Sequence, residues 1–292
     1  MIRLIQSYEE CRDFVDSIEA DPFFSDPMLA NAEQRNSNLV KAIDLPERFC
    51  VFGVFREEKM AGLFSFLVME EENYLEMLAG LSREQRVWEE AFRYLRSSFP
   101  GYDADFVFNP RNFLLREELE KAGADFDREQ QKMVLLYPVP SMDTKEIELL
   151  SDRFIQQYFR LHNTDLYWTG EKVAEAPDRF RTFLAIHEDV VVGYLDVTCC
   201  FAENEPYDLL VMEEYRRKGY GRKLLARAVE MNRPSGMMVL VEVDNFAAIR
   251  LYESVGFEKA ENQNSLTAHW RIPEKRKTQN DPILRGNGTG RG

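Results

Sequence analysis

Short apolar runs and amphipathic runs alternate along the chain, which is the pattern of a mixed fold of strands and helices. Arg48–Gly62 and Arg179–Gly193 each hold an apolar strand, a charged turn and a second strand with a glycine near its start. Both stretches are therefore predicted to be β-hairpins. Pro206–Met212 and Met237–Asp244 are short apolar runs that predict two further buried strands.

An amphipathic helix is predicted between these two strands. In Arg222–Met231, the residues Leu224, Leu225, Ala228 and Val229 fall on one face at helical spacing. Pro234 and Gly236 follow and end the helix. The order of elements in this half is hairpin, strand, helix, strand and a second helix.

The same order occurs in the first half, which predicts a duplicated domain. The hairpins start at 48 and 179, 131 residues apart, and Asn112–Gly123 resembles Asn245–Gly256 at a distance of 133 residues. The prediction is an α/β fold of two tandem domains, each a mixed sheet flanked by helices. The domains are expected at 1–138 and 139–272, followed by a flexible polar tail at 273–292.

The boundary is placed at the proline-containing stretch Tyr137–Asp143, because prolines interrupt regular structure. The preceding strand, Met133–Tyr137, could close the first domain or open the second.

Composition excludes some classes of function. The net charge is −14 and the pI is about 4.9, which argues against nucleic acid as the main partner and is compatible with a cationic substrate. No apolar run approaches the length of a membrane span, and the N-terminal stretch lacks an apolar signal core, so a cytoplasmic protein is expected. The four cysteines and three histidines show no metal-ligand spacing, and no metal site is predicted.

The tightest basic cluster of this acidic chain is YRRKGYGR at 215–222, between a predicted strand and the start of a predicted helix. The first N–H groups of a helix have no intrahelical partner, and the helix dipole is positive there. Gly219 and Gly221 leave the backbone open to close approach. Together these features predict an anion site, although a glycine-eased turn with a solvated basic rim would show the same hexapeptide.

The context of the cluster resembles a known family. LLVMEEYRRKGYGRKLL followed by VEVDNFAAIRLYESVGF is similar to the acyl-CoA-binding core of the GNAT superfamily of N-acyltransferases, from about 190 to 257. Arg216-x-x-Gly219-x-Gly221 and the later Asn245, Tyr252 and Gly256-Phe257 occur in the family's order and spacing.

The resemblance implies how acetyl-CoA would bind. Its diphosphate is expected on the backbone of the basic loop, and its pantetheine arm along the end of the preceding strand. Asn245 is expected to hydrogen-bond the pantetheine or to cap its helix. The expected cofactor-binding residues are Leu209, Leu210, Val211, Arg216, Arg217, Lys218, Gly219, Tyr220, Gly221, Arg222 and Asn245.

The resemblance also implies two catalytic roles. Tyr252 would donate a proton or hydrogen bond to the departing CoA sulfur, and a backbone donor near Val211 would stabilise the carbonyl oxygen. Glu242 is the first choice for the base that takes the proton of the amine, because a carboxylate in an apolar strand needs a partner or a purpose. Glu205 and Asp208 are rivals for that role.

The first copy is expected to lack the cofactor site. At an offset of 133, Gly219 and Gly221 correspond to Arg86 and Trp88, and Tyr252 corresponds to Leu119. Bulky side chains at both glycine positions would block the approach of a diphosphate. The first domain would then brace the active one or help to form the wall of the amine site.

The predicted function is transfer of an acetyl group from acetyl-CoA to a primary amine, by direct attack in a ternary complex. Two alternatives from other classes are a non-catalytic acyl-CoA sensor or scaffold, and an anion-binding module with no thioester specificity. A covalent route through Cys199 or Cys200 is an outside hypothesis. The acceptor is expected to contact variable segments such as Tyr167–Phe180, and the sequence does not identify it.

Overall fold

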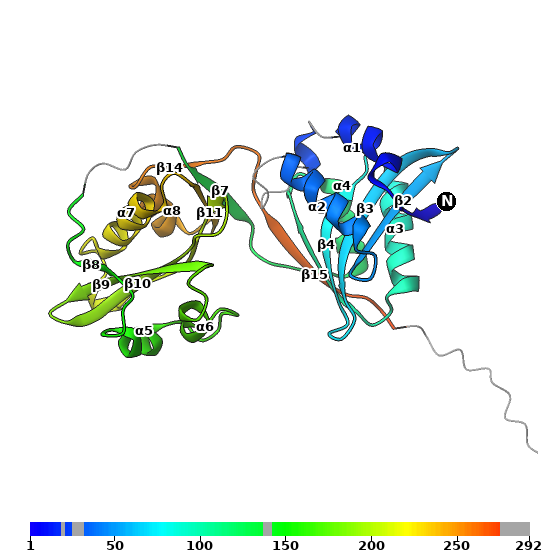
Figure 1. The fold of residues 1–292 in the computed structure, drawn as a ribbon. Helices are drawn as coiled ribbons and strands as arrows, with labels where there is room; N and C mark the ends of the chain where they lie inside the picture. The colour runs from blue at the N-terminus through cyan, green and yellow to red at the C-terminus, as the bar shows by residue number, and fades with distance from the viewer. Residues whose placement is uncertain (19–20, 25–31, 137–141, 275–292) are drawn as a thin grey trace, which may run out of the picture.

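The computed structural model describes residues 1–18, 21–24, 32–136 and 142–274. Most of the predicted linker and all but the first two residues of the predicted tail lie outside these residues. The described residues form two lobes, shown side by side in Figure 1.

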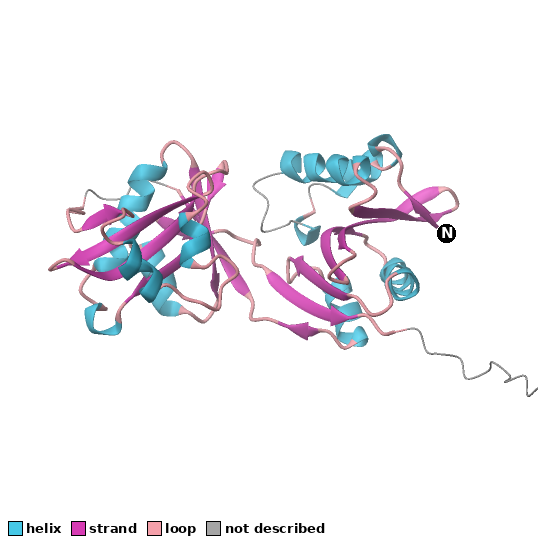
Figure 2. Cartoon of the chain, turned by 60° about the horizontal axis from the view of Figure 1, so that its bottom comes forward, coloured by secondary structure: helices cyan, strands magenta, loops and turns pink. Residues whose placement is uncertain are grey.

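The first lobe has helices on both faces of one sheet (Figure 2). Its elements from the first half of the chain are β1 (Ile2–Leu4), α1 (Arg12–Ile18), α2 (Ala32–Asp44), β2 (Phe49–Arg56), β3 (Lys59–Met69), β4 (Tyr74–Leu81), α3 (Gln85–Ser98), β5 (Asp103–Phe108), α4 (Phe113–Ala122) and β6 (Asp125–Phe126). A short 3-10 turn, Pro22–Phe24, precedes α2.

The second lobe contains two smaller sheets. Its elements are β7 (Gln130–Leu135), β8 (Ile147–Leu149), α5 (Ile155–Leu161), α6 (Gly170–Ala174), β9 (Phe180–His187), β10 (Val190–Thr198), β11 (Glu203–Asn204), β12 (Pro206–Val211), α7 (Tyr220–Asn232), β13 (Gly236–Glu242), α8 (Phe246–Glu253) and β14 (Phe257–Lys259). The last strand of the chain, β15 (Leu266–Arg271), lies in the first lobe.

The predicted duplication is confirmed in the backbone. Each copy has the order hairpin, strand, helix, strand and helix. The two hairpin turns have the same shape: φ is 47° and 64° at Glu57 and Glu58, and again 47° and 64° at Glu188 and Asp189. Positive φ at both central residues defines the turn whose twist matches that of paired strands. The α/β fold class with two tandem domains is therefore correct.

The two copies exchange their final strands. β7 follows the first copy in sequence, yet it pairs antiparallel with β13 and β14 of the second. β15 follows the second copy, yet it pairs antiparallel with β5 and β6 of the first. Figure 1 shows β7 in the lobe of α7 and α8, and β15 in the lobe of α3 and α4. Hydrogen bonding thus crosses the predicted boundary at 138 in both directions, and the strand near Met133 belongs to the second lobe.

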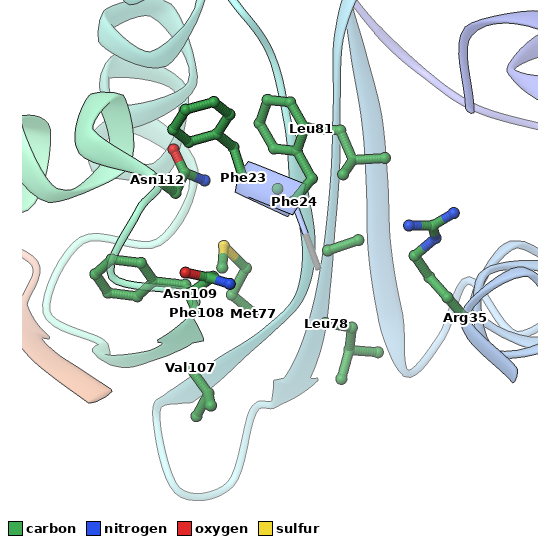
Figure 3. Close-up of a pocket in the computed structure, with 12 residues that line it drawn as sticks. Phe23, Phe24, Arg35, Met77, Leu78, Leu81, Val107, Phe108, Asn109 and Asn112 are labelled. Atoms are coloured by element: carbon green, nitrogen blue, oxygen red, sulfur yellow. The ribbon is translucent and has the colours of Figure 1, made fainter. Parts of the chain in front are cut away.

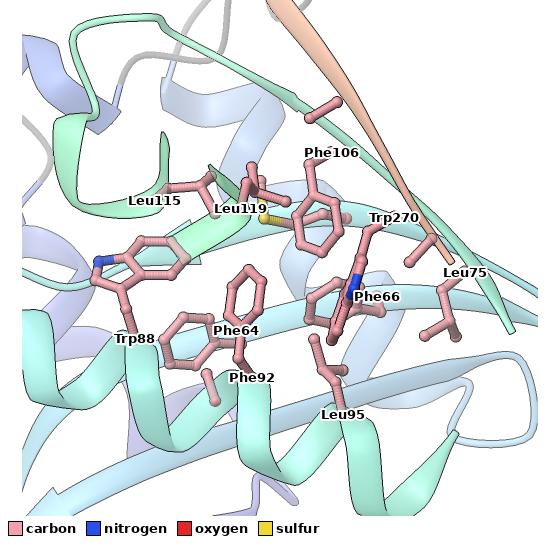
Figure 4. Close-up of a cluster of buried hydrophobic side chains, with 14 of the residues drawn as sticks. Phe64, Phe66, Leu75, Trp88, Phe92, Leu95, Phe106, Leu115, Leu119 and Trp270 are labelled. Carbon is pink, nitrogen blue, oxygen red and sulfur yellow. The ribbon is translucent and has the colours of Figure 1, made fainter. Parts of the chain in front are cut away.

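The core of the first lobe depends on this exchange. Phe64, Trp88, Phe92 and Phe106 form its aromatic centre, and Trp270 from β15 stacks on Phe92 with ring centroids 5.0 Å apart (Figure 4). Trp270 is 2% exposed. Burying an aromatic side chain of this size contributes several kcal/mol, so the last strand is a structural part of the first lobe.

Candidate active site

The second lobe splits between β12 and β13, and this split positions the site. β11 and β13 pair in parallel at two positions, Glu203 with Gly236 and Asn204 with Met237. Beyond this point, in the described residues, β12 pairs with β10 and β13 pairs with β7. The segment that contains β11 and β12 therefore begins beside β13, and β12 and β13 then continue in separate sheets.

The edge of β12 that faces away from β10 offers backbone groups. The N–H of Met212 donates to the carbonyl of Val192, 2.9 Å away, on the β10 side. Because backbone groups alternate in direction along a strand, those of Leu209 and Val211 point to the opposite edge. This is the edge at which the family resemblance predicts the pantetheine arm and the donor to the carbonyl oxygen.

The glycine-containing loop leads into the N-terminus of α7. Arg217 and Gly219 have positive φ, 61° and 90°. A Cβ built on Gly219 would meet no atom within 4 Å, so the surface beside it is open. Within the described residues, no side chain caps this helix end, and the first intrahelical bond runs from the Lys223 N–H to the Gly219 carbonyl, at 3.0 Å. The N–H groups of Tyr220, Gly221 and Arg222 precede that bond and remain for a ligand.

The side chains of the loop have separate roles. Arg216 donates through Nε to the Val211 carbonyl at 2.9 Å, which ties the loop to the end of β12. Lys218 lies over the Tyr215 ring, 4.9 Å from its centroid. Tyr220 is 7% exposed, so its side chain is not available to a ligand at the surface. Arg217 and Arg222 are exposed and add positive charge.

Asn245 is the N-cap of α8. Its Oδ1 accepts a hydrogen bond from the Ala248 N–H at 3.1 Å. Asn112 caps α4 of the first copy in the same way, with a distance of 3.2 Å to the Leu115 N–H. The cap role is therefore common to both copies, and contact with a ligand remains a prediction.

Tyr252 is buried beside the split. It is 8% exposed, and its ring packs edge-on against Phe257 at 5.5 Å. Burial, with a smaller contribution from the charge of Asp208, raises the pKa of Tyr252 to about 12. The phenol therefore keeps its proton at neutral pH, as a proton donor must.

The three candidate bases differ in their surroundings. The side chain of Glu242 is 43% exposed and forms an ion pair with Arg128 at 3.1 Å. Burial raises the pKa of Glu205, opposed by the charge of Arg179. Burial also raises the pKa of Asp208, although a hydrogen bond of 2.5 Å from the Tyr194 hydroxyl opposes the shift.

Asp208 and Tyr252 flank β12 from opposite faces. Leu209 and Val211 pack into the core that contains Tyr252, whereas Leu210 packs with the cluster around α5. Since side chains alternate along a strand, Asp208 lies on the α5 face together with Leu210. A carboxylate and a phenol thus lie on the two sides of the strand that carries the free backbone edge.

The sequence analysis missed three residues next to Asp208. His162 at the end of α5 is hydrogen-bonded to Asp196 of β10, and Tyr194 of β10 stacks on His162 and donates to Asp208. The available signal was Asp196, a charged residue inside the apolar run Val190–Thr198. Its partner His162 lies 34 residues earlier in the sequence.

The first copy has a filled site at the equivalent place. A cavity at the C-terminal ends of β4 and β5 has a volume of about 30 Å³, which is room for roughly one water molecule. Phe23 and Phe24 project into it from the turn before α2, and Asn112 lies at its rim (Figure 3). Trp88 is 1% exposed, and its Nε1 donates to the Ser82 carbonyl, 3.1 Å away, in the turn before α3.

The described residues contain neither a membrane-spanning helix nor a metal-binding group of side chains. None of the helices there is long and apolar enough to cross a membrane. No group of three or more His, Cys, Asp or Glu side chains within that part of the chain is arranged to hold a metal ion.

Comparison with known proteins identifies the domain. Residues 178–259 match the family described as "Acetyltransferase (GNAT) domain". An uncharacterised protein of Mycobacterium leprae (strain TN) is 36% identical over 75 residues, which cover 24% of this chain and 21% of that protein. The match thus spans about a fifth of the length of that relative.

Solved structures resemble the whole chain. A tandem GNAT protein from the clavulanic acid biosynthesis pathway is 12% identical, with a TM-score of 0.58 over 94% of this chain and 99% of that one. A GCN5-related N-acetyltransferase from Sphaerobacter thermophilus is 14% identical, with a TM-score of 0.61 over 94% and 96% of the two chains. The second half of the chain therefore contains a GNAT domain, and the chain as a whole has the tandem GNAT fold.

Proposed function

We propose that this protein is an acyl-CoA-dependent N-acyltransferase that transfers an acetyl group from acetyl-CoA to a primary amine. The observation that carries the proposal is the open, glycine-led N-terminus of α7 beside the split between β12 and β13. An uncapped helix N-terminus next to a free strand edge suits a ligand with a diphosphate and an extended amide-containing arm.

The residues present fit such a ligand. The N–H groups across Arg217–Arg222 would hold the diphosphate, with the charges of Arg217 and Arg222 adding to the helix dipole. The free edge of Leu209–Val211 would pair with the amides of the pantetheine arm. Acetyl-CoA would supply the activated acyl group as a thioester.

Residues of this chain would then accept one proton from the amine and donate another to the departing sulfur. The amine nitrogen forms a bond to the acyl carbon as the bond from that carbon to sulfur breaks. The proton lost by the amine passes to a carboxylate, and the Tyr252 hydroxyl donates to the departing sulfur. The Val211 N–H would stabilise negative charge on the carbonyl oxygen.

Asp208 suits the role of base better than Glu242, the first choice from sequence. Glu242 is engaged by Arg128 and is 43% exposed. Asp208 is partly buried and its pKa is raised. Its charge also contributes to the raised pKa of Tyr252. A base with a raised pKa accepts a proton more readily near neutral pH than an ordinary aspartate does.

The test is calorimetric titration of the full chain with acetyl-CoA and, separately, with pyrophosphate, followed by a free-thiol release assay with a panel of amines. We expect one acetyl-CoA bound per chain, weaker binding of pyrophosphate, and thiol release with at least one amine. Tight acetyl-CoA binding without turnover would support a sensor instead, and equal affinity for pyrophosphate would support an anion-binding module.

A matched pair of variants locates the site. Gly219 and Gly123 both have positive φ, 90° and 77°, and a Cβ on either would meet nothing within 4 Å. Gly219→Val and Gly123→Val should therefore carry a similar backbone strain of about 1–2 kcal/mol. Only Gly219→Val should weaken acetyl-CoA binding, by at least ~10-fold. Equal binding by both variants would contradict the proposed site.

A further inference from the structure

A buried charged cluster lies directly behind Asp208. Its centre is Asp196, which is 0% exposed. Asp196 accepts hydrogen bonds from the Tyr158 hydroxyl at 3.0 Å, from Thr182 Oγ1 at 2.5 Å and from His162 Nε2 at 3.0 Å. The three side chains thus replace the hydrogen bonds to water that this carboxylate loses on burial.

An oxygen atom lies within hydrogen-bond distance of each ring nitrogen of His162. Its Nε2 lies 3.0 Å from a carboxylate oxygen of Asp196, and its Nδ1 lies 2.7 Å from the Asn163 carbonyl oxygen. The Asn163 carbonyl can only accept, and so can Asp196 as a carboxylate; with Asp196 in that form both ring nitrogens donate, and the ring is an imidazolium. Burial lowers the pKa of His162, but the hydrogen bonds to Asp196 and Asn163 outweigh this effect and the net pKa is raised.

Tyr194 joins the imidazolium to Asp208. The His162 ring stacks on the Tyr194 ring with centroids 4.9 Å apart and an interplanar angle of 15°. The Tyr194 hydroxyl donates to Asp208 Oδ2 at 2.5 Å and accepts from the Asn163 N–H at 3.0 Å. The hydroxyl is thus oriented by a backbone donor, so that its own proton points to Asp208.

The segment 163–169, between α5 and α6, is anchored on the same cluster. It begins after His162 and ends before Gly170, which opens α6. A Cβ on Gly170 would lie only 3.1 Å from the Cβ of His162, so the absence of a side chain brings α6 against the ring. The Trp168 N–H also donates to the Tyr207 hydroxyl of β12 at 3.2 Å, one residue from Asp208.

We propose that the His162–Asp196 ion pair, acting through Tyr194, is a positioning device that orients Asp208, favours its ionised form and holds the segment 163–169 beside it. The inference rests on the proposed function, in which Asp208 takes the proton of the amine. The groups that face Asp208 are Tyr194 and Asp196 from β10 and His162 from the end of α5, and Tyr252 of α8 lies across β12 within range of its charge.

The test is NMR titration of the full chain labelled with ¹³C at aspartate side-chain carboxyls, with the Asp208 signal assigned by its loss in Asp208→Asn. In Tyr194→Phe, which removes the donor to Asp208, we expect the titration midpoint of Asp208 to rise by about one pH unit or more. Tyr158→Phe is the matched control: it removes a buried hydroxyl from the adjacent ring, but that hydroxyl contacts Asp196. Its midpoint should move by less than ~0.3 unit. Equal midpoints in wild type and Tyr194→Phe would overturn the proposal.

A second measurement on the wild-type chain keeps the proposal testable if Tyr194→Phe does not fold. The chain has three histidines, so His162→Gln assigns the imidazole signals of His162 in ¹⁵N-histidine spectra. We expect doubly protonated nitrogens on His162 at pH 7, and a neutral ring there would overturn the proposal. Neither readout needs acyl donor or amine, so failure here is distinguishable from failure of the acyltransferase proposal.

Discussion

At the scale of single residues, surroundings separate carboxylates that look alike in sequence. Glu242 and Asp208 both lie in apolar strands, and the sequence gives no reason to prefer Asp208. The structure places Arg128 against Glu242, whereas it places a tyrosine hydroxyl and a buried imidazolium near Asp208. The ion pair with Arg128 occupies a carboxylate oxygen of Glu242 that a base would need for the proton of the amine.

This difference leads to a prediction about the base. Asp208→Asn should lower kcat about 100-fold or more, and Glu242→Gln should change it less than ~3-fold, in thiol-release assays. Because burial raises the pKa of Asp208, the wild-type rate should fall with decreasing pH at a higher pH than an ordinary aspartate would give. That decrease should disappear in Asp208→Asn. The reverse order of effects would return the role to Glu242.

A second prediction concerns Tyr252. Removing its hydroxyl in Tyr252→Phe should lower kcat about 10- to 100-fold, because the departing thiolate loses its proton donor. The acetyl-CoA dissociation constant should change less than ~3-fold, since the ring and its packing on Phe257 remain. Stopped-flow turnover and calorimetry measure the two effects. A twofold or smaller change in kcat would show that the hydroxyl has no role in the step.

At the scale of elements, the local sequence pattern predicted the helices and strands that short-range interactions determine. Hairpins, buried strands and the glycine-led helix follow from alternation, turn residues and helical spacing, and each lies where it was expected. The offset of 133, however, does not hold at the helix start. α3 begins at Gln85 and α7 at Tyr220, so Glu84 occupies the cap position of Gly219, in place of the predicted Arg86. The loop before α3 is shorter, and a constant offset misses such a deletion.

The exchanged strands and the buried cluster could not be predicted in the same way. β7 and β15 are both strands of six residues, and nothing in their local sequences states which sheet each will join. Asp196 and His162 are joined only when α5 packs on β10. Partners of this kind depend on tertiary contacts, and a histidine at a helix end is compatible with many surroundings.

At the scale of the whole molecule, the two copies of the domain differ in how open the surface is at the equivalent place. The second copy has an open helix N-terminus beside its split strands, and in the first copy Phe23 and Phe24 line the small cavity at the equivalent place. The first copy nevertheless remains bound to the second through both exchanged strands. Each lobe therefore contains a strand that belongs in sequence to the other copy.

The exchange predicts that a change near the end of the chain will loosen the first lobe. Trp270→Ala should lower the free energy of unfolding by about 3–5 kcal/mol, because it removes a buried ring that stacks on Phe92. Hydrogen exchange should accelerate in β5 and α3, which precede the substitution by more than 150 residues. Trp168→Ala, a change of the same size within the segment 163–169, should leave exchange in the first lobe unaltered. If Trp270→Ala loosened only the second lobe, β15 would not be an integral strand of the first, and the reciprocal exchange would be excluded.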